Sequence, residues 1–433
     1  MPASAAGQAT AVLASASAAF GPAATTLSFA LGGVALGSVS GLVPGLHANA
    51  FALALAAAAP ALPGPPTAVV AAILAAGVVH TFLDVIPGLV LGVPDAATAP
   101  ASLPGHRLVL AGRGTEALRL SALGSVAALV VAVPLSVPLS HLVAEGSNLL
   151  RTWLPVLLAA VVCLLVLSEP TRRARVAGVG CFLLAAALGF VTLDLSPTRA
   201  VVPAGVASML APLFAGLFGA PVVLDAVDSA GPIPPQADGR VGLSPGAVLR
   251  SALSGVGGGV LVGYLPGVSA GVAAVLALGG RGGATPNAEG TTDRAYVVAT
   301  SGANTATAVF ALGSLAVVGT PRSGVTVAVA SAAPGDAPFG LAGFLAVAVL
   351  AGGAGAVLVP LLGDRYLRVA RSVSHRRLSL SVLALLWASS FAFAGVVGVC
   401  AFAVAAVVGL LPPRFGTRRV HLMGVLVGPV VVG

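Results

Sequence analysis

The chain has 433 residues, of which 58% are apolar and only 8% are charged, and its mean hydropathy is +1.05. Soluble domains carry about 25% charged residues, so this composition excludes a soluble protein and predicts one embedded in a lipid bilayer. The formal net charge is +8. The basic residues are all arginines, and most of them fall in short breaks between apolar runs, which indicates the positive-inside bias of membrane proteins and not a nucleic-acid partner.

The length leaves room for roughly 10 to 12 membrane-crossing or re-entrant segments of about 20 residues, so we predict an all-α polytopic membrane protein. Residues 1–20 form an N-terminal segment without the basic stretch of a secretory signal, and we expect it to belong to the mature protein. A first transmembrane repeat follows over 21–224, then a polar linker over 225–246 and a second transmembrane repeat over 247–433.

Each repeat opens on an unusual interruption of an apolar stretch. In the first repeat this is Gly41-Leu-Val-Pro-Gly45, followed by the polar residues His47 and Asn49. In the second it is Gly263-Tyr-Leu-Pro-Gly267, followed by Ser269. A Pro-Gly pair removes backbone hydrogen bonds from a spanning helix, which is tolerated where protein or a watery cavity replaces them.

We therefore predict broken or re-entrant helices at 41–60 and 263–279. Paired interruptions in corresponding halves point to the binding site of a secondary transporter. The alternative is that both are structural kinks, in which the polar side chains only satisfy freed backbone groups.

The helix predicted over 67–83 ends with His80 and Asp84, which lie four residues apart on one face. Such a pair suits proton coupling, because burial favours a protonated carboxyl group and histidine titrates near neutrality. The alternative is an interfacial cap at the helix end.

Two further landmarks occur in both repeats. The first is Gly92-Val-Pro94-Asp95, which corresponds to Gly319-Thr320-Pro321-Arg322-Ser323, and it predicts a second helix break in each copy near 92–98 and 319–326. The second closes each half and is Leu217-Phe-Gly-Ala-Pro221 or Leu426-Val-Gly-Pro429. Because the three landmarks recur in the same order, at offsets of 222, 227 and 208 residues, we predict two copies of one structural unit.

The arginine-rich breaks predict how the two copies are related. They lie at 107–119, 172–175, 365–377 and 414–419. If they share the cytoplasmic side, the helix near 120–141 runs outward and its counterpart near 339–362 runs inward. The repeats are then inverted, as in many secondary transporters, and the N-terminus is extracytoplasmic.

Arg322 is the most informative charge, because a charge inside such a segment marks a functional site or an internal ion pair. Its planar guanidinium suits a carboxylate or phosphate. It could instead pair with Asp95, its counterpart in the first repeat, or reach a membrane surface.

We expect an anion to bind where the two Pro-Gly interruptions face each other, because helix N-termini present unpaired N–H groups and a positive dipole end. Thr305, Thr307 and Asn304 could also offer oxygen atoms to Na⁺, although serine and threonine residues that face other helices often only join them. The candidate substrate-binding residues are Gly45, His47, Asn49, Pro94, Asp95, Gly267, Ser269, Asn304, Thr305, Thr320, Arg322 and Ser323.

These residues resemble a known family, the large membrane subunit of tripartite tricarboxylate transporters, called TctA. The resemblance includes both Gly-x-x-Pro-Gly segments, the later Gly-x-Pro elements, the loop over 104–117 and the helix segment Ser301-Gly-Ala-Asn304-Thr-Ala-Thr307. It extends from about residue 25 to the end of the chain.

The resemblance implies a permease of an organic anion, a di- or tricarboxylate, in the cell membrane, driven by an H⁺ or Na⁺ gradient. It also implies a small membrane subunit and an extracytoplasmic binding protein as partners. Pro266-Gly267-Val268-Ser269 is similar to a motif of undecaprenyl-phosphate translocases as well, which makes a polyprenyl-phosphate carrier translocase the alternative function.

An enzymatic function gains no support from the sequence. The chain has no lysine to complete a phosphate-binding loop and no run of acidic or histidine residues at one predicted interface. The cysteines lack metal-ligand or redox spacing, so we expect no metal site and no cofactor beyond a coupling ion.

Overall fold

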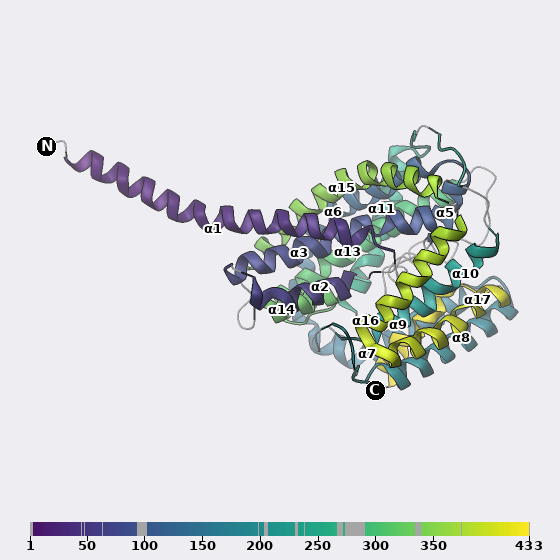
Figure 1. Cartoon of the computed structure of the whole chain (residues 1–433). Helices are drawn as coiled ribbons and strands as arrows, with labels where there is room; N and C mark the ends of the chain where they lie inside the picture. The colour runs from purple at the N-terminus through teal and green to yellow at the C-terminus, as the bar shows by residue number, and fades with distance from the viewer. Residues whose placement is uncertain are drawn as a thin grey trace.

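The computed structural model describes residues 3–432 with the following exceptions: 45, 47, 63, 93–101, 198, 203–206, 230–232, 238, 266–271, 273–290, 334–338 and 374. The described part is built of helices and contains no strand (Figure 1). Within it, eight helices are long and apolar enough to cross a membrane. The predicted all-α polytopic membrane architecture is therefore confirmed.

The helices of the first half run from the N-terminus into the first residues of the predicted linker. They are α1 (Ala3–Gly41), α2 (Ala48–Ala58), the 3-10 helix η1 (Ala59–Ala61), α3 (Pro66–Leu83), α4 (Val85–Leu91), α5 (Ser102–Leu110), α6 (Gly114–Glu145), α7 (Ser147–Leu167), α8 (Arg172–Thr192), α9 (Leu210–Phe214), the π-helix η2 (Ala215–Gly219) and α10 (Ala220–Ser229).

The second half follows after an irregular segment. Its helices are α11 (Pro245–Tyr264), α13 (Thr291–Gly313), the π-helix η3 (Ser314–Val318), α14 (Gly324–Ala332), α15 (Leu341–Ser372), α16 (His375–Gly409), α17 (Leu411–Phe415), the 3-10 helix η4 (Arg419–Met423) and α18 (Gly424–Val432).

Small residues let α1 pack so closely on α3 that the backbones of the two helices are in contact. A Cβ atom at Gly33 or Gly37 of α1 would overlap the carbonyl group of Ala72 or Ala76 of α3. Gly33 lies against Ala72 and Gly37 lies against Ala76. Because the residue numbers rise together in both helices, α1 and α3 are parallel. The chain must therefore return between them, and α2 lies in that connection.

The same arrangement recurs in the second half, between α11 and α13. A Cβ atom at Gly255 would overlap the carbonyl group of Ala299, and one at Gly259 would meet Ala303 and Ala306. Gly255 and Gly259 follow Gly33 and Gly37 at the offset of 222 residues that separates the Pro-Gly landmarks. This recurrence supports the predicted repeat.

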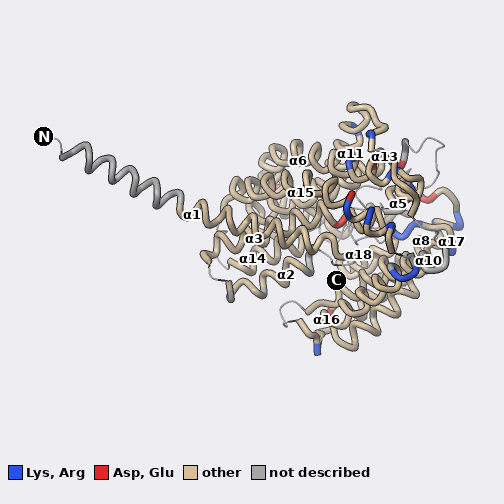
Figure 2. Tube along the Cα trace, turned by 45° about the horizontal axis from the view of Figure 1, so that its top comes forward, with Lys and Arg blue, Asp and Glu red and all other residues tan. Residues whose placement is uncertain are grey.

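The long helices α6 and α15 pack side by side and run in opposite directions, because Leu118 lies against Gly363 and Leu129 against Gly352. Figure 2 shows arginines and acidic residues gathered at the end of the molecule where α5, α8 and α17 lie. Because α6 follows α5, it begins at this end. The opposite directions agree with inverted repeats, but the inversion itself stays a prediction.

A second core forms where each closing segment packs on a long helix of the other half. Gly216 of η2 lies against Phe402 and Ala405 of α16, and Gly424 of α18 lies against Phe182 of α8. α16 contains a non-helical residue, Gly395 (φ 60°, ψ −150°). Residues 380–387 and 402–406 on its two sides line the same groove, so α16 is a pair of helices that folds back at Gly395.

Candidate functional site

The first Pro-Gly landmark lies at the end of α1. α1 ends at Gly41, where the N–H of Val43 donates to the carbonyl of Ser40 (3.1 Å), and α2 begins at Ala48. The helix is therefore broken where the sequence predicts it. Gly41 packs against the carbonyl of His80 and the side chain of Leu83, so the break lies beside the last turns of α3.

Three predicted binding residues belong to this break. Gly45 and His47 lie outside the described residues, and Asn49 lies in the first turn of α2 but its side chain is not described. Their proposed contacts with substrate stay predictions.

The second Pro-Gly landmark follows the end of α11. α11 ends at Tyr264 and Leu265 is extended (φ −99°, ψ 123°). The Tyr264 hydroxyl lies 2.8 Å from Oγ of Ser140 and ties this helix end to α6. Gly267 and Ser269 lie outside the described residues.

His80 is fully buried at the level of the first break. Its Nδ1 lies 2.8 Å from Oγ of Ser40, and its ring stacks with Phe51 of α2. The Ser40 hydroxyl also donates to the carbonyl of Gly37 (3.1 Å). Because a hydroxyl has one proton, both contacts are satisfied when Nδ1–H donates to Ser40, which leaves Nε2 as the basic nitrogen.

Asp84 lies one turn beyond His80, between α3 and α4. It is 5% exposed, and its backbone N–H donates to the carbonyl of His80 (2.9 Å). It precedes α4 but its side chain makes no capping hydrogen bond there. His80 and Asp84 are thus both buried inside the protein, and their role in coupling stays a prediction.

α13 brings the polar residues of the second repeat to α3. Nδ2 of Asn304 donates to the carbonyl of Thr81 (3.0 Å). The hydroxyls of Thr305 and Thr307 are buried and make no hydrogen bond within the described part of the chain. Buried hydroxyls of this kind are candidates for a ligand or a Na⁺ ion.

The Gly-x-Pro landmarks of the two repeats, which begin at Gly92 and Gly319, share one backbone feature. α4 ends at Leu91 and is capped by Gly92 (φ 68°, ψ 12°), and η3 ends at Val318 and is capped by Gly319 (φ 71°, ψ 15°). Glycine adopts this left-handed conformation without a Cβ penalty, so it ends each helix at the predicted position. Pro94 and Asp95 lie outside the described residues, and so does the proposed pairing of Asp95 with Arg322.

The chain after Gly319 is held by local polar contacts. The N–H of Thr320 donates to the carbonyl of Ser314 (3.2 Å), and Oγ of Ser314 donates to the carbonyl of Thr320 (2.9 Å). Ser323 and Thr326 form a capping box at the start of α14. Thr320 and Ser323 thus position the backbone beside Arg322.

Arg322 lies two residues before the start of α14, next to the N-cap residue Ser323, and is partly buried. Its backbone N–H donates to Oγ1 of Thr326 (3.0 Å). Val325, in the first turn of α14, packs against Gly77 of α3. The start of α14 therefore lies against the same part of α3 that contacts α1 and α13.

The segment 77–84 of α3 is thus the meeting point of three other elements. The end of α1 reaches it at His80, α13 reaches it at Thr81, and the start of α14 reaches it at Gly77. We define this region as the α3 junction. The structure brings His80, Asp84, Asn304 and the backbone of Arg322 to the α3 junction.

Sequence reasoning did not identify Ser40, which holds His80. It also missed two ion clusters that join the halves of the chain. In the first, Glu116 of α6 accepts from Arg294 of α13 (2.8 Å) and pairs with Arg113 (2.7 Å). Both Glu116 and Arg294 are almost fully buried, which makes this pair a structural link.

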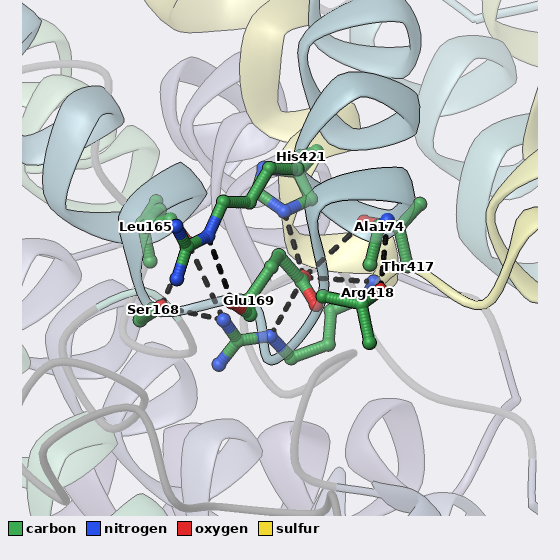
Figure 3. Close-up of polar contacts among 9 residues, drawn as sticks. Leu165, Ser168, Glu169, Ala174, Thr417, Arg418 and His421 are labelled. Atoms are coloured by element: carbon green, nitrogen blue, oxygen red, sulfur yellow. Dashed lines mark hydrogen bonds and ion pairs between the residues drawn. The ribbon is translucent and has the colours of Figure 1, made fainter.

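The second ion cluster surrounds Glu169, in the turn between α7 and α8 (Figure 3). Its Oε1 accepts from Nε of Arg418 (2.9 Å), lies 2.9 Å from Nε2 of His421, and accepts from Thr417 (3.2 Å). Burial alone would raise the pKa of Glu169, but hydrogen bonds from His421 and Arg418 and the charge of Arg418 lower it to about 2.

No group of three or more His, Cys, Asp or Glu side chains is close enough to hold a metal ion in the described part of the chain.

Comparison with known proteins identifies the chain's relatives. A family model described as the tripartite tricarboxylate transporter TctA family matches residues 27–424, which is nearly the whole chain. An uncharacterized protein of Methanocaldococcus jannaschii, MJ1079, is 26% identical over 193 residues, or 45% of this chain and 46% of that protein. The aligned part therefore spans about half the length of this curated relative. No solved structure matches the chain.

Proposed function

Because the chain belongs to the tripartite tricarboxylate transporter TctA family, we propose that it is a secondary active transporter of a di- or tricarboxylate in the cell membrane. Its partners would be a small membrane subunit and an extracytoplasmic binding protein, as the tripartite organisation of the family implies.

The α3 junction is the observation that carries this proposal. A helix break, a buried histidine and carboxyl group, an amide and an arginine belong to four elements that meet on one segment of α3. The described break, after α1, lies at this segment, and broken helices at the interface of two repeats typically form the binding sites of secondary transporters.

Each group at the α3 junction has a distinct proposed role. The guanidinium of Arg322 would bind a carboxylate of the substrate through two parallel hydrogen bonds. The N–H groups after the Pro-Gly breaks would bind the other oxygen atoms of the anion. Asn304, already fixed on α3 by its bond to Thr81, would orient the substrate.

The coupling ion would bind beside the substrate. A proton could be held by Nε2 of His80 or by Asp84, and a Na⁺ ion by the hydroxyls of Thr305 and Thr307. Either cation would offset the charge of a buried anion, since an uncompensated charge inside the membrane is costly.

Uptake of radiolabelled citrate into proteoliposomes containing the purified chain tests the proposal. We expect saturable uptake that requires either an inward H⁺ gradient or an inward Na⁺ gradient, and that stops when an ionophore dissipates that gradient. The assay should be repeated with the accessory subunits, because the family is tripartite.

A substitution of His80, a candidate coupling residue, provides a second test of the proposal. If H⁺ is the coupling ion, His80→Asn should abolish gradient-driven uptake but retain exchange of internal for external citrate. The proposal would be contradicted if the protein showed no uptake and no saturable binding of any di- or tricarboxylate, either with or without the accessory subunits. Transport of a short-chain polyprenyl phosphate instead would favour the alternative function.

A further inference from the structure

An apolar groove of about 550 Å³ lies between α8 and α17, which Figure 1 shows side by side. Its lining includes the small residues Ala177 and Gly180 and the larger residues Leu184, Leu411 and Phe415. Leu184 is 50% exposed and Phe415 is 46% exposed, so the groove is open on the outer surface of the helix bundle. In a membrane protein this surface faces lipid.

One end of the groove is basic. Arg172 and Arg173, at the start of α8, line it together with the apolar residues. Both are exposed, and neither side chain makes a hydrogen bond or an ion pair with a described residue. Glu169 does not neutralise them, because its carboxylate is buried and held by Arg418 and His421.

The dimensions of the groove fit one leaflet of a membrane. From Arg172 to Leu184 the helix rises about 18 Å, at about 1.5 Å per residue. Half of a hydrocarbon core of about 30 Å is about 15 Å, so a headgroup at the arginines would place an acyl chain along the apolar part. The two arginines begin α8, and Figure 2 shows α8 and α17 at the arginine-rich end of the molecule, where the positive-inside rule predicts the cytoplasmic leaflet.

We propose that this groove binds an anionic phospholipid, with the lipid phosphate on Arg172 and Arg173 and an acyl chain along Ala177, Gly180 and Leu411. Basic pockets at the cytoplasmic ends of membrane helices favour anionic headgroups over zwitterionic ones. A bound lipid would fill the space between α8 and α17.

Native mass spectrometry of the purified full-length protein, titrated with dioleoyl phosphatidylglycerol or dioleoyl phosphatidylcholine, tests this site. We expect the double variant R172Q/R173Q to bind phosphatidylglycerol about 30-fold more weakly, which corresponds to about 1 kcal/mol for each arginine near an anionic headgroup. Arg250→Gln is the matched control, because Arg250 is also exposed but does not line the groove.

A second variant tests the apolar part and leaves both arginines in place. A Cβ atom at Gly180 would meet no neighbouring atom, so Gly180→Leu should fold normally and place its side chain in the groove. We expect it to lose phosphatidylglycerol binding. Gly257→Leu is the control, since Gly257 of α11 is also exposed and without close neighbours but lies outside the groove.

Competition with inorganic phosphate shows whether the site binds a lipid or only a free anion. We expect inorganic phosphate in excess to leave phosphatidylglycerol bound. Equal binding of the two lipids by the unmodified protein would overturn the proposal. Unchanged phosphatidylglycerol binding in Gly180→Leu, or displacement by inorganic phosphate, would overturn it as well, because the site would then not hold an acyl chain.

Discussion

Oγ of Ser40 on α1 lies 2.8 Å from Nδ1 of His80 on α3, and both side chains are buried. This contact fixes the broken end of α1 to the α3 junction. It also fixes the imidazole so that Nε2 is the nitrogen that can accept a proton. The Ser40 hydroxyl therefore links the position of the helix break to the imidazole of His80 and its protonation.

Ser40→Ala should change the pH dependence of citrate uptake, because His80 loses the partner that orients its ring. The free energy of unfolding should fall by about 1 kcal/mol, as for the loss of a typical buried hydrogen bond. Ser38→Ala is the control, since the one hydrogen bond of the Ser38 hydroxyl to a described residue is within its own helix, to the carbonyl of Val34 (2.7 Å). An unchanged pH profile in Ser40→Ala, with uptake intact, would disprove the link.

The glycines of α1 should differ sharply in their tolerance of a methyl group. Gly37→Ala should destabilise the protein by about 1–3 kcal/mol, because the new Cβ overlaps the carbonyl of Ala76 and α1 must move away from α3. Gly32→Ala, with open space around its Cβ, should be neutral or slightly stabilising. Thermal unfolding in detergent measures both, and equal melting temperatures would contradict this packing.

The same contrast should hold in α11 if the halves are two copies of one unit. A Cβ atom at Gly259 meets Ala303 and Ala306, whereas one at Gly257 meets nothing. Gly259→Ala should therefore lower the melting temperature and Gly257→Ala should not. A reversed order would argue against the correspondence between α1 and α11.

The ion cluster at Glu169 should make stability depend on pH in the acid range. Its folded pKa of about 2 lies below the ordinary value of 4.5, so its stabilisation is complete above about pH 4.5 and is lost as the pH falls toward 2. The loss is at most about 3.5 kcal/mol, since each pKa unit corresponds to about 1.4 kcal/mol.

Melting temperatures between pH 5 and pH 2.5 test this cluster. Glu169→Gln should be less stable than the unmodified protein at pH 5, and the difference should shrink as the pH falls. Glu145→Gln, at an exposed glutamate, is the control and should follow the unmodified protein. A constant difference between Glu169→Gln and the unmodified protein across this range would contradict the assigned ionisation.

Asn304→Ala should weaken citrate binding and lower stability by about 1–3 kcal/mol, because it leaves the carbonyl of Thr81 without its donor. Thr307→Val keeps nearly the same shape on the same helix. Since the Thr307 hydroxyl makes no hydrogen bond with a described residue, this variant should retain stability. Na⁺-dependent uptake that is lost in Thr307→Val would identify Na⁺ as the coupling ion.

The sequence was sufficient to predict features that depend on local backbone chemistry. The break after Gly41, the helix over 67–83 and the helix ends at Gly92 and Gly319 all follow from proline and glycine, whose conformational limits are local. These positions were confirmed close to where the patterns placed them.

Contacts that depend on packing could not be predicted in this way. Ser40 is one of many serines in apolar helices, and nothing in the sequence pairs it with His80. Glu169 and Arg418 are 249 residues apart, and only the packing of α8 on η4 and α18 brings them together. Which of these distant residues come into contact depends on how the whole chain packs, so no short motif in the sequence predicts such contacts.

The central claim is that the α3 junction binds a carboxylate anion through Arg322. Equilibrium binding of radiolabelled citrate to the purified protein tests it most directly, with Arg322→Gln as the variant. Arg368→Gln is the control, at an exposed arginine of α15. We predict saturable binding by the unmodified protein and the control, and a loss of about 1.5–3 kcal/mol, or about 10- to 150-fold in affinity, in Arg322→Gln. Citrate binding of equal affinity in a folded Arg322→Gln protein would contradict the claim.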